Sequence, residues 1–183
     1  MRQRATLLVL IAVLAGSPHG AAGEASSSAS GTCGNKLLDA GETCAQCAAD
    51  CAVQPCKPSK AHARFAVEFT PPEVPDVSTA VVLIGYRSDR LNLPGSGEDK
   101  SVRSRLTFPT HSVMAFNDLD YGLRIVASHA QAIPAGQLLT IDFDRCAGAP
   151  VPTVADMSCQ IEACAGSTGA AEGCRCNIIA LTP

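Results

Sequence analysis

The stretch Ala61–Thr70 reads AHARFAVEFT and alternates apolar with polar side chains, which is the period of two that a β-strand imposes. Phe65, Val67 and Phe69 share one side of this predicted strand, so that side is expected to face a core and the other side water. A second stretch, Ala80–Tyr86, reads AVVLIGY. A continuous apolar run of this length is too short for a helix and predicts a strand buried on both faces.

The remainder of the chain continues in the same way, with short apolar segments between turns that contain Gly and Pro. No segment carries apolar residues at helical spacing over three turns. Short strands at regular intervals are typical of an antiparallel β-sandwich, and a jelly-roll barrel is the closest alternative. We therefore predict an all-β fold with a loop at Leu91–Lys100 and further strands at Val102–Phe108, Val113–Phe116, Tyr121–Ala127, Leu138–Phe143 and Arg175–Leu181.

The N-terminal segment has the features of a signal peptide. Two arginines lie among the first four residues, an apolar run follows at Ala5–Ala15, and the small residues of Ala21–Gly23 offer a cleavage site. The run is shorter than the roughly 20 residues that a spanning helix needs, so no membrane span is expected after cleavage. We predict a signal peptide at residues 1–23, a mobile linker at residues 24–32, and a protein that is secreted or held in the cell envelope or periplasm.

Export makes disulfide bonds the expected state of the cysteines, because thiols persist mainly in the reducing cytosol. The ten cysteines form two clusters of five, so either one bridge joins the clusters or each cluster keeps a free thiol. We expect no free thiol, whereas the pairing itself cannot be deduced from spacing. The predicted disulfide cysteines are Cys33, Cys44, Cys47, Cys51, Cys56, Cys146, Cys159, Cys164, Cys174 and Cys176.

The first cluster defines a module at Cys33–Cys56, which is too short to fold around an apolar core and must be stabilised by bridges. Two alternatives exist for Cys44-x-x-Cys47. With Cys51 and Cys56 it would form a zinc site, although zinc ligands usually come as two separated pairs. A thioredoxin-like redox pair needs a strand-to-helix junction that the surrounding sequence lacks.

Composition and motifs argue against several function classes. The chain has 183 residues, 17% of them charged, and a net charge of −3, which excludes a basic nucleic-acid binder. His62, His111 and His129 are isolated, and neither a G-x-S-x-G nor an H-E-x-x-H motif occurs. Asp142 and Asp144 are expected on a solvated strand face, where a glycosidase pair would not be desolvated. We therefore expect no enzyme.

Two oxygen-rich turns are candidates for calcium, which prefers carboxylate and carbonyl oxygens. Both are shorter than a full EF-hand loop, and turn capping is the competing explanation. No other cofactor is expected. The first set is Asn117, Asp118 and Asp120, and the second is Asn35, Asp39 and Glu42.

Aromatic residues are scarce, which bears on sugar binding. Carbohydrate sites often stack sugar rings on Trp or Tyr faces. The chain has no Trp and only two tyrosines, Tyr86 and Tyr121. Its five Phe fall in predicted strands, where packing in the core is their usual fate. A flat aromatic platform is therefore hard to build, which leaves a site that binds sugars by hydrogen bonds as the alternative.

Two stretches resemble known families. Cys33–Cys51, CGNKLLDAGETCAQCAADC, resembles a short cysteine-rich module of exported bacterial proteins with the pattern C-G-N-x-x-L-D-x-G-E-x-C-x-x-C-x-x-D-C. The region at residues 61–183 is similar to cohesin domains, which carry the segment I-P-x-G-x-L-x-x-I-x-F. The residues that match this segment are Ile133, Pro134, Gly136, Leu138, Ile141 and Phe143.

The cohesin resemblance implies a nine-stranded sandwich of the kind shared with carbohydrate-binding modules. It also implies a binding function, with a protein or polysaccharide partner at the cell exterior. The five C-terminal cysteines depart from ordinary cohesins, which puts their usual dockerin partner in doubt. We expect an exported, non-enzymatic binding or adhesion module. The alternatives are an accessory domain or small enzyme of polysaccharide degradation, and a structural protein of the cell envelope.

Overall fold

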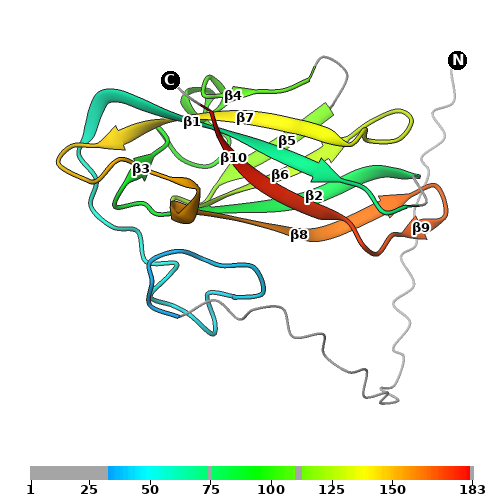
Figure 1. Ribbon diagram of the computed structural model, residues 1–183, viewed down its shortest axis with the longest axis horizontal. Coiled ribbons are helices and arrows are strands. Elements are labelled where there is room, and N and C mark those ends of the chain that lie inside the picture. Colours follow the sequence, from blue (N-terminus) through cyan, green and yellow to red (C-terminus); the bar gives the residue numbers. More distant parts are fainter. Residues whose placement is uncertain (1–32, 74–75, 110–112, 182–183) are drawn as a thin grey trace, which may run out of the picture.

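Two antiparallel β-sheets lie face to face in the computed structural model, which describes residues 33–73, 76–109 and 113–181 (Figure 1). The predicted β-sandwich is thereby confirmed. The first sheet has the order β10 (Arg175–Leu181), β1 (Pro58–Thr70), β7 (Gly136–Cys146) and β3 (Leu91–Asn92), and β4 (Leu106–Thr107) also pairs with β7. The second sheet has the order β5 (Val113–Asp118), β6 (Gly122–Ser128), β2 (Val77–Tyr86), β8 (Met157–Gly166) and β9 (Gly169–Ala170). The predicted signal peptide, the predicted linker and His111 lie outside the described residues.

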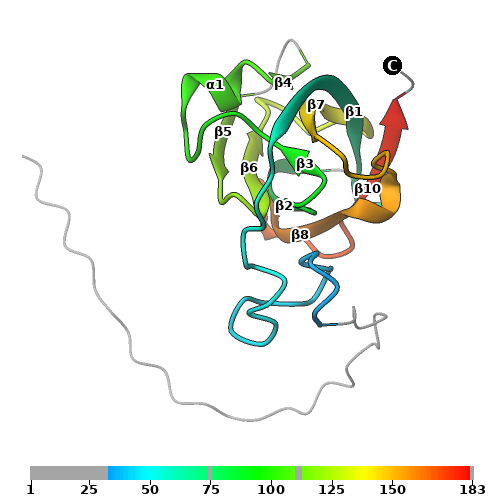
Figure 2. The same cartoon turned by 90° about the vertical axis from the view of Figure 1, so that its left-hand side faces the viewer.

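The core lies between the two sheets, which are seen end-on in Figure 2. Phe65, Val67 and Phe69 of β1 are buried, as their alternation predicts. The ring of Phe143 on β7 contacts those of Phe65 and Tyr86, with centroids 6.2 and 5.0 Å away. These aromatic contacts join β1 and β7 of one sheet to β2 of the other, so the largest side chains hold the two layers together.

Strand β2 is buried on both faces, as its continuous apolar sequence predicts. Val82 and Ile84 are inaccessible to solvent on the core side. Leu83 and Gly85 are buried on the opposite side. At Gly85 this outer side is covered by the cysteine-rich module, because an added Cβ there would meet the carbonyl oxygen of Leu38 at 2.6 Å.

The predicted strand at Val102–Phe108 is wrong over most of its length. Its first part forms one helical turn, α1 (Lys100–Arg103), and only β4 is extended. Val102 and Leu106 are both buried and are four residues apart, a spacing that suits a helix as well as a strand. The Arg103 guanidinium lies 4.4 Å from the centroid of the Phe108 ring and donates a hydrogen bond to the carbonyl oxygen of Leu106.

All ten cysteines form disulfide bonds, so the expected absence of a free thiol is confirmed. One bridge joins the two clusters, and the zinc and redox alternatives are wrong because the four cysteines concerned belong to three different bridges. The pairs are Cys33–Cys47, Cys44–Cys51, Cys56–Cys146, Cys159–Cys176 and Cys164–Cys174. Five bridges indicate an oxidising environment outside the cytoplasm. No helix within the described ranges is long and apolar enough to cross a membrane.

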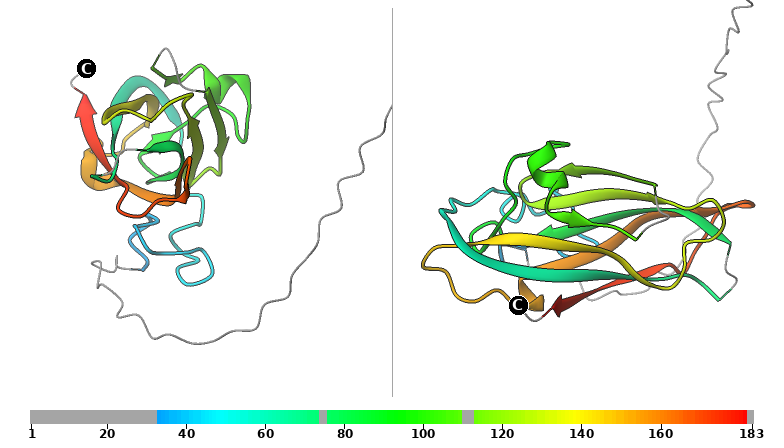
Figure 3. Two further views of the ribbon diagram at one scale, coloured as in Figure 1. Left: turned by 90° about the vertical axis from the view of Figure 1, so that its right-hand side faces the viewer. Right: turned by 90° about the horizontal axis from the view of Figure 1, so that it is seen from above.

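The module Cys33–Cys56 consists of turns and lies against the second sheet, beneath β2 and β8 (Figures 1 and 3). Its chain wraps around the carboxylate of Asp50, which accepts hydrogen bonds from the amides of Gly34 and Lys36 at 2.7–3.0 Å. Both donors have left-handed backbones, with φ of 91° and 69°. Asp50 therefore serves as the internal hydrogen-bonding centre of a segment that has almost no core.

Candidate binding groove

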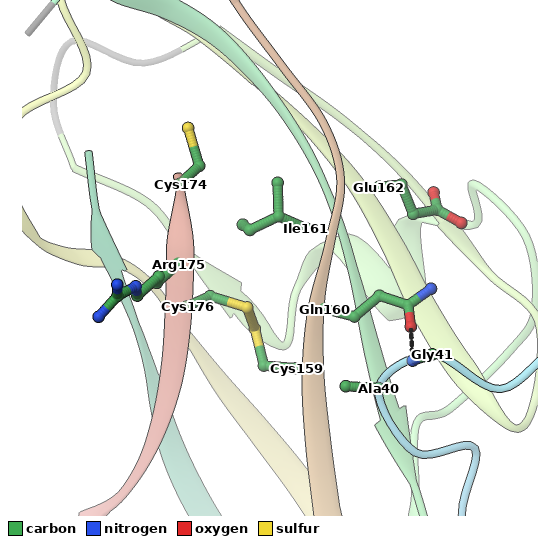
Figure 4. A pocket seen from close by; sticks show the side chains of 9 residues that line it. All are labelled: Ala40, Gly41, Cys159, Gln160, Ile161, Glu162, Cys174, Arg175 and Cys176. Atoms are coloured by element: carbon green, nitrogen blue, oxygen red, sulfur yellow. Dashed lines mark hydrogen bonds between the residues drawn. A yellow bond between two sulfur atoms is a disulfide. The ribbon is translucent and has the colours of Figure 1, made fainter. Parts of the chain in front are cut away.

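A groove runs along one side of the sandwich, where β8 of the second sheet faces β10 of the first (Figure 4). It encloses about 770 Å³. The module supplies one wall, and the two strands supply the rest. The lining residues are Ala40, Gly41, Cys159, Gln160, Ile161, Glu162, Cys174, Arg175 and Cys176.

Two disulfides fix the separation of the strands that form the groove. Cys159–Cys176 and Cys164–Cys174 both connect β8 to β10 or to the residue immediately before it. Ile161 lies between the two bridges in sequence, and Figure 4 shows its side chain in the space between the strands. The floor is thus apolar and cross-linked, which limits how far the groove can open or close.

The module wall is held in place by polar contacts to β8. The amide of Gly41 donates a hydrogen bond to Oε1 of Gln160 at 2.8 Å, drawn as a dashed line in Figure 4. The hydroxyl of Ser158 donates to the carbonyl oxygen of Leu38. Leu38 is only 5% exposed because it lies between the module and the sheet. The wall is therefore positioned by alternate residues of a single strand.

A salt bridge anchors the module at a second point. Nζ of Lys36 lies 3.2 Å from Oδ2 of Asp89, and Arg87 donates two hydrogen bonds to the same carboxylate. The Arg87 hydrogen bond, assisted by Lys36, holds the pKa of Asp89 below its ordinary value. Nearby, the amide of Gln54 donates to Oγ of Ser88 at 2.8 Å.

The rim of the groove carries charge. Arg124 on β6 makes two hydrogen bonds to the carboxylate of Glu162 on β8, at 2.7 and 2.8 Å. This pairing raises the pKa of Arg124. Arg175 is exposed and makes no ion pair with any described residue. The rim thus offers hydrogen-bond donors and acceptors beside an apolar floor.

The groove continues past the Cys159–Cys176 bridge. A second hollow of about 280 Å³ shares that bridge with the first and extends to Val154, Asn177 and Ile178. Val154 is 46% exposed, an unusual exposure for a large apolar residue in this chain. The two hollows together follow most of β8 and β10, so the combined groove is long rather than round.

The strands that flank the groove have free edges. β10 pairs only with β1, and β8 meets β9 only at Ala165 and Gly166. From Met157 to Ala163 the outer edge of β8 has no strand partner among the described residues. Such an edge presents backbone donors and acceptors that can pair with another extended chain.

A charged cluster lies on the other sheet, around His62 on β1. Its Nδ1 is 2.9 Å from Arg105, 3.2 Å from Oδ1 of Asp142 and 3.5 Å from Oδ1 of Asp144. Arg105 also donates to Asp144 at 2.7 Å. Ser104, a hydroxyl beside this cluster, donates its hydrogen bond to the carbonyl oxygen of Ser101 instead of to the imidazole. Among the described residues, the contacts of the His62 imidazole in this cluster are with Arg105, Asp142 and Asp144, and no hydroxyl group is bonded to it.

The remaining predicted site residues are spread out. Asn117 is exposed, and its neighbour Asp118 is buried, since successive residues of β5 face opposite sides. Oδ1 of Asp118 accepts hydrogen bonds from the hydroxyl of Tyr86 at 2.7 Å and the amide of Asp120 at 3.1 Å. Burial raises the pKa of Asp118 from 3.8 to about 6. A calcium site at these three residues stays a prediction.

His129 and Tyr86, considered above as a base and as a sugar-stacking ring, both make hydrogen bonds within the fold. Nδ1 of His129 accepts the amide of Gln131 at 3.2 Å, which caps a turn. Tyr86 is 2% exposed, and burial next to Asp118 raises its pKa. Its ring is therefore part of the core and cannot serve as a sugar-stacking surface, which leaves Tyr121 as the one tyrosine with some exposure among the described residues.

Comparisons of the chain with protein-family models, with curated proteins and with solved structures give no match.

Sequence reasoning missed the residues that line the groove. Strand β8 was not predicted, although Met157, Cys159 and Ile161 alternate with polar residues as a strand requires. The cysteines in this segment concealed the alternation, because they were assigned to bridges and not to a strand face. The contribution of Ala40 and Gly41 depends on how the module docks, for which the sequence offers no local signal.

Proposed function

We propose that the protein is a non-catalytic binding domain that acts outside the cytoplasm and docks an extended segment of a partner protein in the groove between β8 and β10. The observation that carries this proposal is the pair of free strand edges along a long, cross-linked groove. The bridges hold the Cα atoms of the paired cysteines 5.9 and 6.6 Å apart, so the segment lies over the groove and pairs with one of its two free edges. There it gains main-chain hydrogen bonds, and its alternate side chains reach the floor.

The lining of the groove favours a protein over a polysaccharide. Its floor is Ile161 and two disulfides, and no aromatic residue belongs to either hollow. A sugar chain would lack a ring to stack on, whereas an apolar side chain of a peptide can pack on Ile161. Glu162 and Arg175 can then pair with charges on the partner at the rim.

The resemblance to cohesin domains agrees with this proposal, because those domains bind another protein. The partner here is defined only by its chemistry: an extended segment that alternates apolar and polar residues. The five bridges support secretion or retention in the cell envelope or periplasm, where such a rigid domain would persist.

The experiment selects ligands and maps where they bind. The disulfide-bonded chain is immobilised and used to select twelve-residue peptides from a phage-displayed library, and the selected peptides are measured by fluorescence anisotropy. In NMR spectra of the protein, we expect the amide chemical shifts that change when a peptide binds to belong to β8 and β10. Ala40→Trp, which fills the groove from the module wall, is expected to weaken binding about tenfold or more.

The matched control is Ala115→Trp, the same change at an exposed alanine of β5 on the opposite edge of the second sheet. It should leave affinity unchanged. A polysaccharide panel is tested in parallel. The groove proposal would be refuted by chemical-shift changes confined to the face around His62, or by binding of a polysaccharide without any peptide ligand. Release of soluble sugars from a polysaccharide would refute the proposal that the domain is non-catalytic.

A further inference from the structure

The cysteine-rich module buries two carboxylates close together. Glu42 is 7% exposed and Asp50 is 2% exposed. A carboxylate oxygen of each lies within 4.8 Å of the other and of the sulfur atoms of Cys33 and Cys47. Burial of two like charges at this separation is unfavourable unless a cation or a proton compensates them.

One oxygen of this pair has no hydrogen-bond partner. Oε2 of Glu42 accepts the amide of Asp39 at 3.1 Å, whereas Oε1 is buried and unbonded. A buried carboxylate oxygen without a partner lowers the stability of the fold, because its hydrogen bonds to water are lost and no protein hydrogen bond replaces them. The Glu42 carboxylate lies beside a second buried carboxylate, and a cation would compensate such a pair.

No basic side chain fills that role in the described part of the chain. The only lysine of the module segment near the pair, Lys36, has its ammonium group on Asp89 of the sandwich. Asp50 is compensated only by the amides of Gly34 and Lys36. Glu42 accepts a single amide hydrogen bond, so no described basic side chain compensates the pair.

The donor set selects the kind of cation. Cys33 and Cys47 are bonded to each other, so their sulfurs are not thiolates and cannot attract zinc or another soft metal. Carboxylate oxygens remain, and these suit a hard cation with many oxygen ligands. Asp39 lies outside this group of ligand atoms, and its Oδ2 accepts a hydrogen bond from the amide nitrogen of Asn35 at 2.7 Å, so calcium at Asn35 and Asp39 stays a prediction.

We propose that Glu42 and Asp50 bind one Ca²⁺ ion in the cysteine-rich module. Oε1 of Glu42 is the ligand that its burial leaves free, and Asp50 supplies the second carboxylate. Calcium takes six to eight oxygens, so water completes its coordination. The ion neutralises the buried pair and stabilises the turns that wrap around Asp50.

Titration of the exported chain, carrying all five disulfides, with CaCl₂ after treatment with a chelator tests this proposal. Isothermal calorimetry is expected to give one site per chain, and calcium is expected to raise the melting temperature and slow amide exchange at Gly34 and Lys36. Mg²⁺ and Zn²⁺ at equal concentration should bind more weakly. Absence of any calcium-dependent heat, melting shift or exchange protection in the unmodified protein would overturn the proposal without recourse to a variant.

Variants locate the site. Glu42→Gln keeps the shape of the side chain and is expected to weaken calcium binding about tenfold or more by removing one ligand charge. Glu98→Gln, the same change at an exposed glutamate of the sandwich, is the matched control and should bind calcium as the wild type does. Unchanged affinity in Glu42→Gln, or loss of the site in Asp118→Asn, would place calcium elsewhere and contradict the proposal. Mass mapping of the disulfides verifies that each variant has folded.

Discussion

The module and the sandwich are stabilised by different forces. The sandwich has an apolar core in which Phe65, Phe143 and Ile141 are almost inaccessible to water. The module is closed by two internal bridges, and apart from a bridging cysteine its only buried apolar side chains are Leu37 and Leu38. The difference shows how cross-links replace a core in a segment too short to have one.

The two regions also depend on each other unequally. The module buries Leu37 and Leu38 against the outer side of β2 and β8, and the Cys56–Cys146 disulfide links its chain to β7. The sandwich, which has its own core, uses the module as a cover at Gly85 and as a hydrogen-bond partner of Ser158 and Gln160. Perturbing the core should therefore unfold both regions, whereas perturbing the contact between them should release the module alone.

The largest effect is expected from Phe143→Ala. This change removes the ring that joins Phe65 to Tyr86 and should lower the free energy of unfolding by about 3–5 kcal/mol. Urea denaturation followed by near-UV absorbance of tyrosine measures it. Val154→Ala, at an exposed valine, serves as a control with little change. A loss below about 1 kcal/mol for Phe143→Ala would mean that bridges, not the core, hold the sandwich.

The next largest effect concerns the bridge between the regions. Replacing Cys56 and Cys146 together by Ser opens a loop with a sequence separation of 90 residues. The unfolded chain gains entropy, so stability should fall by about 2–4 kcal/mol. The double replacement of Cys44 and Cys51, separated by 7 residues, should cost less and only in the module. Equal losses for the two double variants in calorimetry would contradict the unequal dependence.

A smaller and more local effect is expected from Gly85→Ala. The new methyl group would meet the Leu38 carbonyl oxygen at 2.6 Å, a distance that forces the module away from the sheet. We expect a cost of about 1–3 kcal/mol that falls on the contact between the regions. Hydrogen exchange should show faster exchange at Gly41 and unchanged protection in β1 and β7. Protection retained at Gly41 would show that the module tolerates the shift.

The smallest effect is confined to the sandwich and depends on pH. The folded pKa of Asp118 is raised from 3.8 to about 6, so its favourable contribution is complete below pH 4 and disappears as pH rises through 6. Asp118→Asn should therefore gain stability relative to the wild type by about 2 kcal/mol between pH 4 and pH 7.5. The new amide lacks an acceptor at the buried Oδ2 position, which lowers the stability of the variant equally at both pH values and leaves the pH-dependent gain unchanged. Denaturation in chelator at both pH values measures this, and a difference that is constant with pH would contradict it.

The sequence was sufficient for the parts of the fold that rest on local pattern. The alternation around Phe65 and the continuous run at Ala80–Tyr86 predict β1 and β2, because burial on one face or two leaves a direct mark on residue choice. The strand prediction around Val102 was wrong, since Val102 and Leu106, a buried pair four residues apart, fit a helical turn and a strand equally well. Strand β8 was not predicted because its cysteines both form disulfide bonds and occupy the apolar positions of the alternation.

The candidate sites depend on contacts between distant segments, and these leave little trace in one sequence. Ala40 and Gln160 meet only because the module docks on β8. Glu42 was recognised as an oxygen donor, but Asp50 was not grouped with it, since eight positions and a turn separate them. The odd number of cysteines in each cluster did restrict the pairing, and Cys56–Cys146 is the bridge that one of the two options required.

The most direct test of the account is a map of the disulfides, obtained by digesting the unreduced protein in the presence of an alkylating agent and identifying the linked peptides by mass spectrometry. The structure predicts five linked pairs, no alkylated cysteine, and a peptide in which Cys56 is joined to Cys146. Recovery of Cys56 linked within its own module, or of alkylated Cys44 and Cys47 from the native protein, would contradict it.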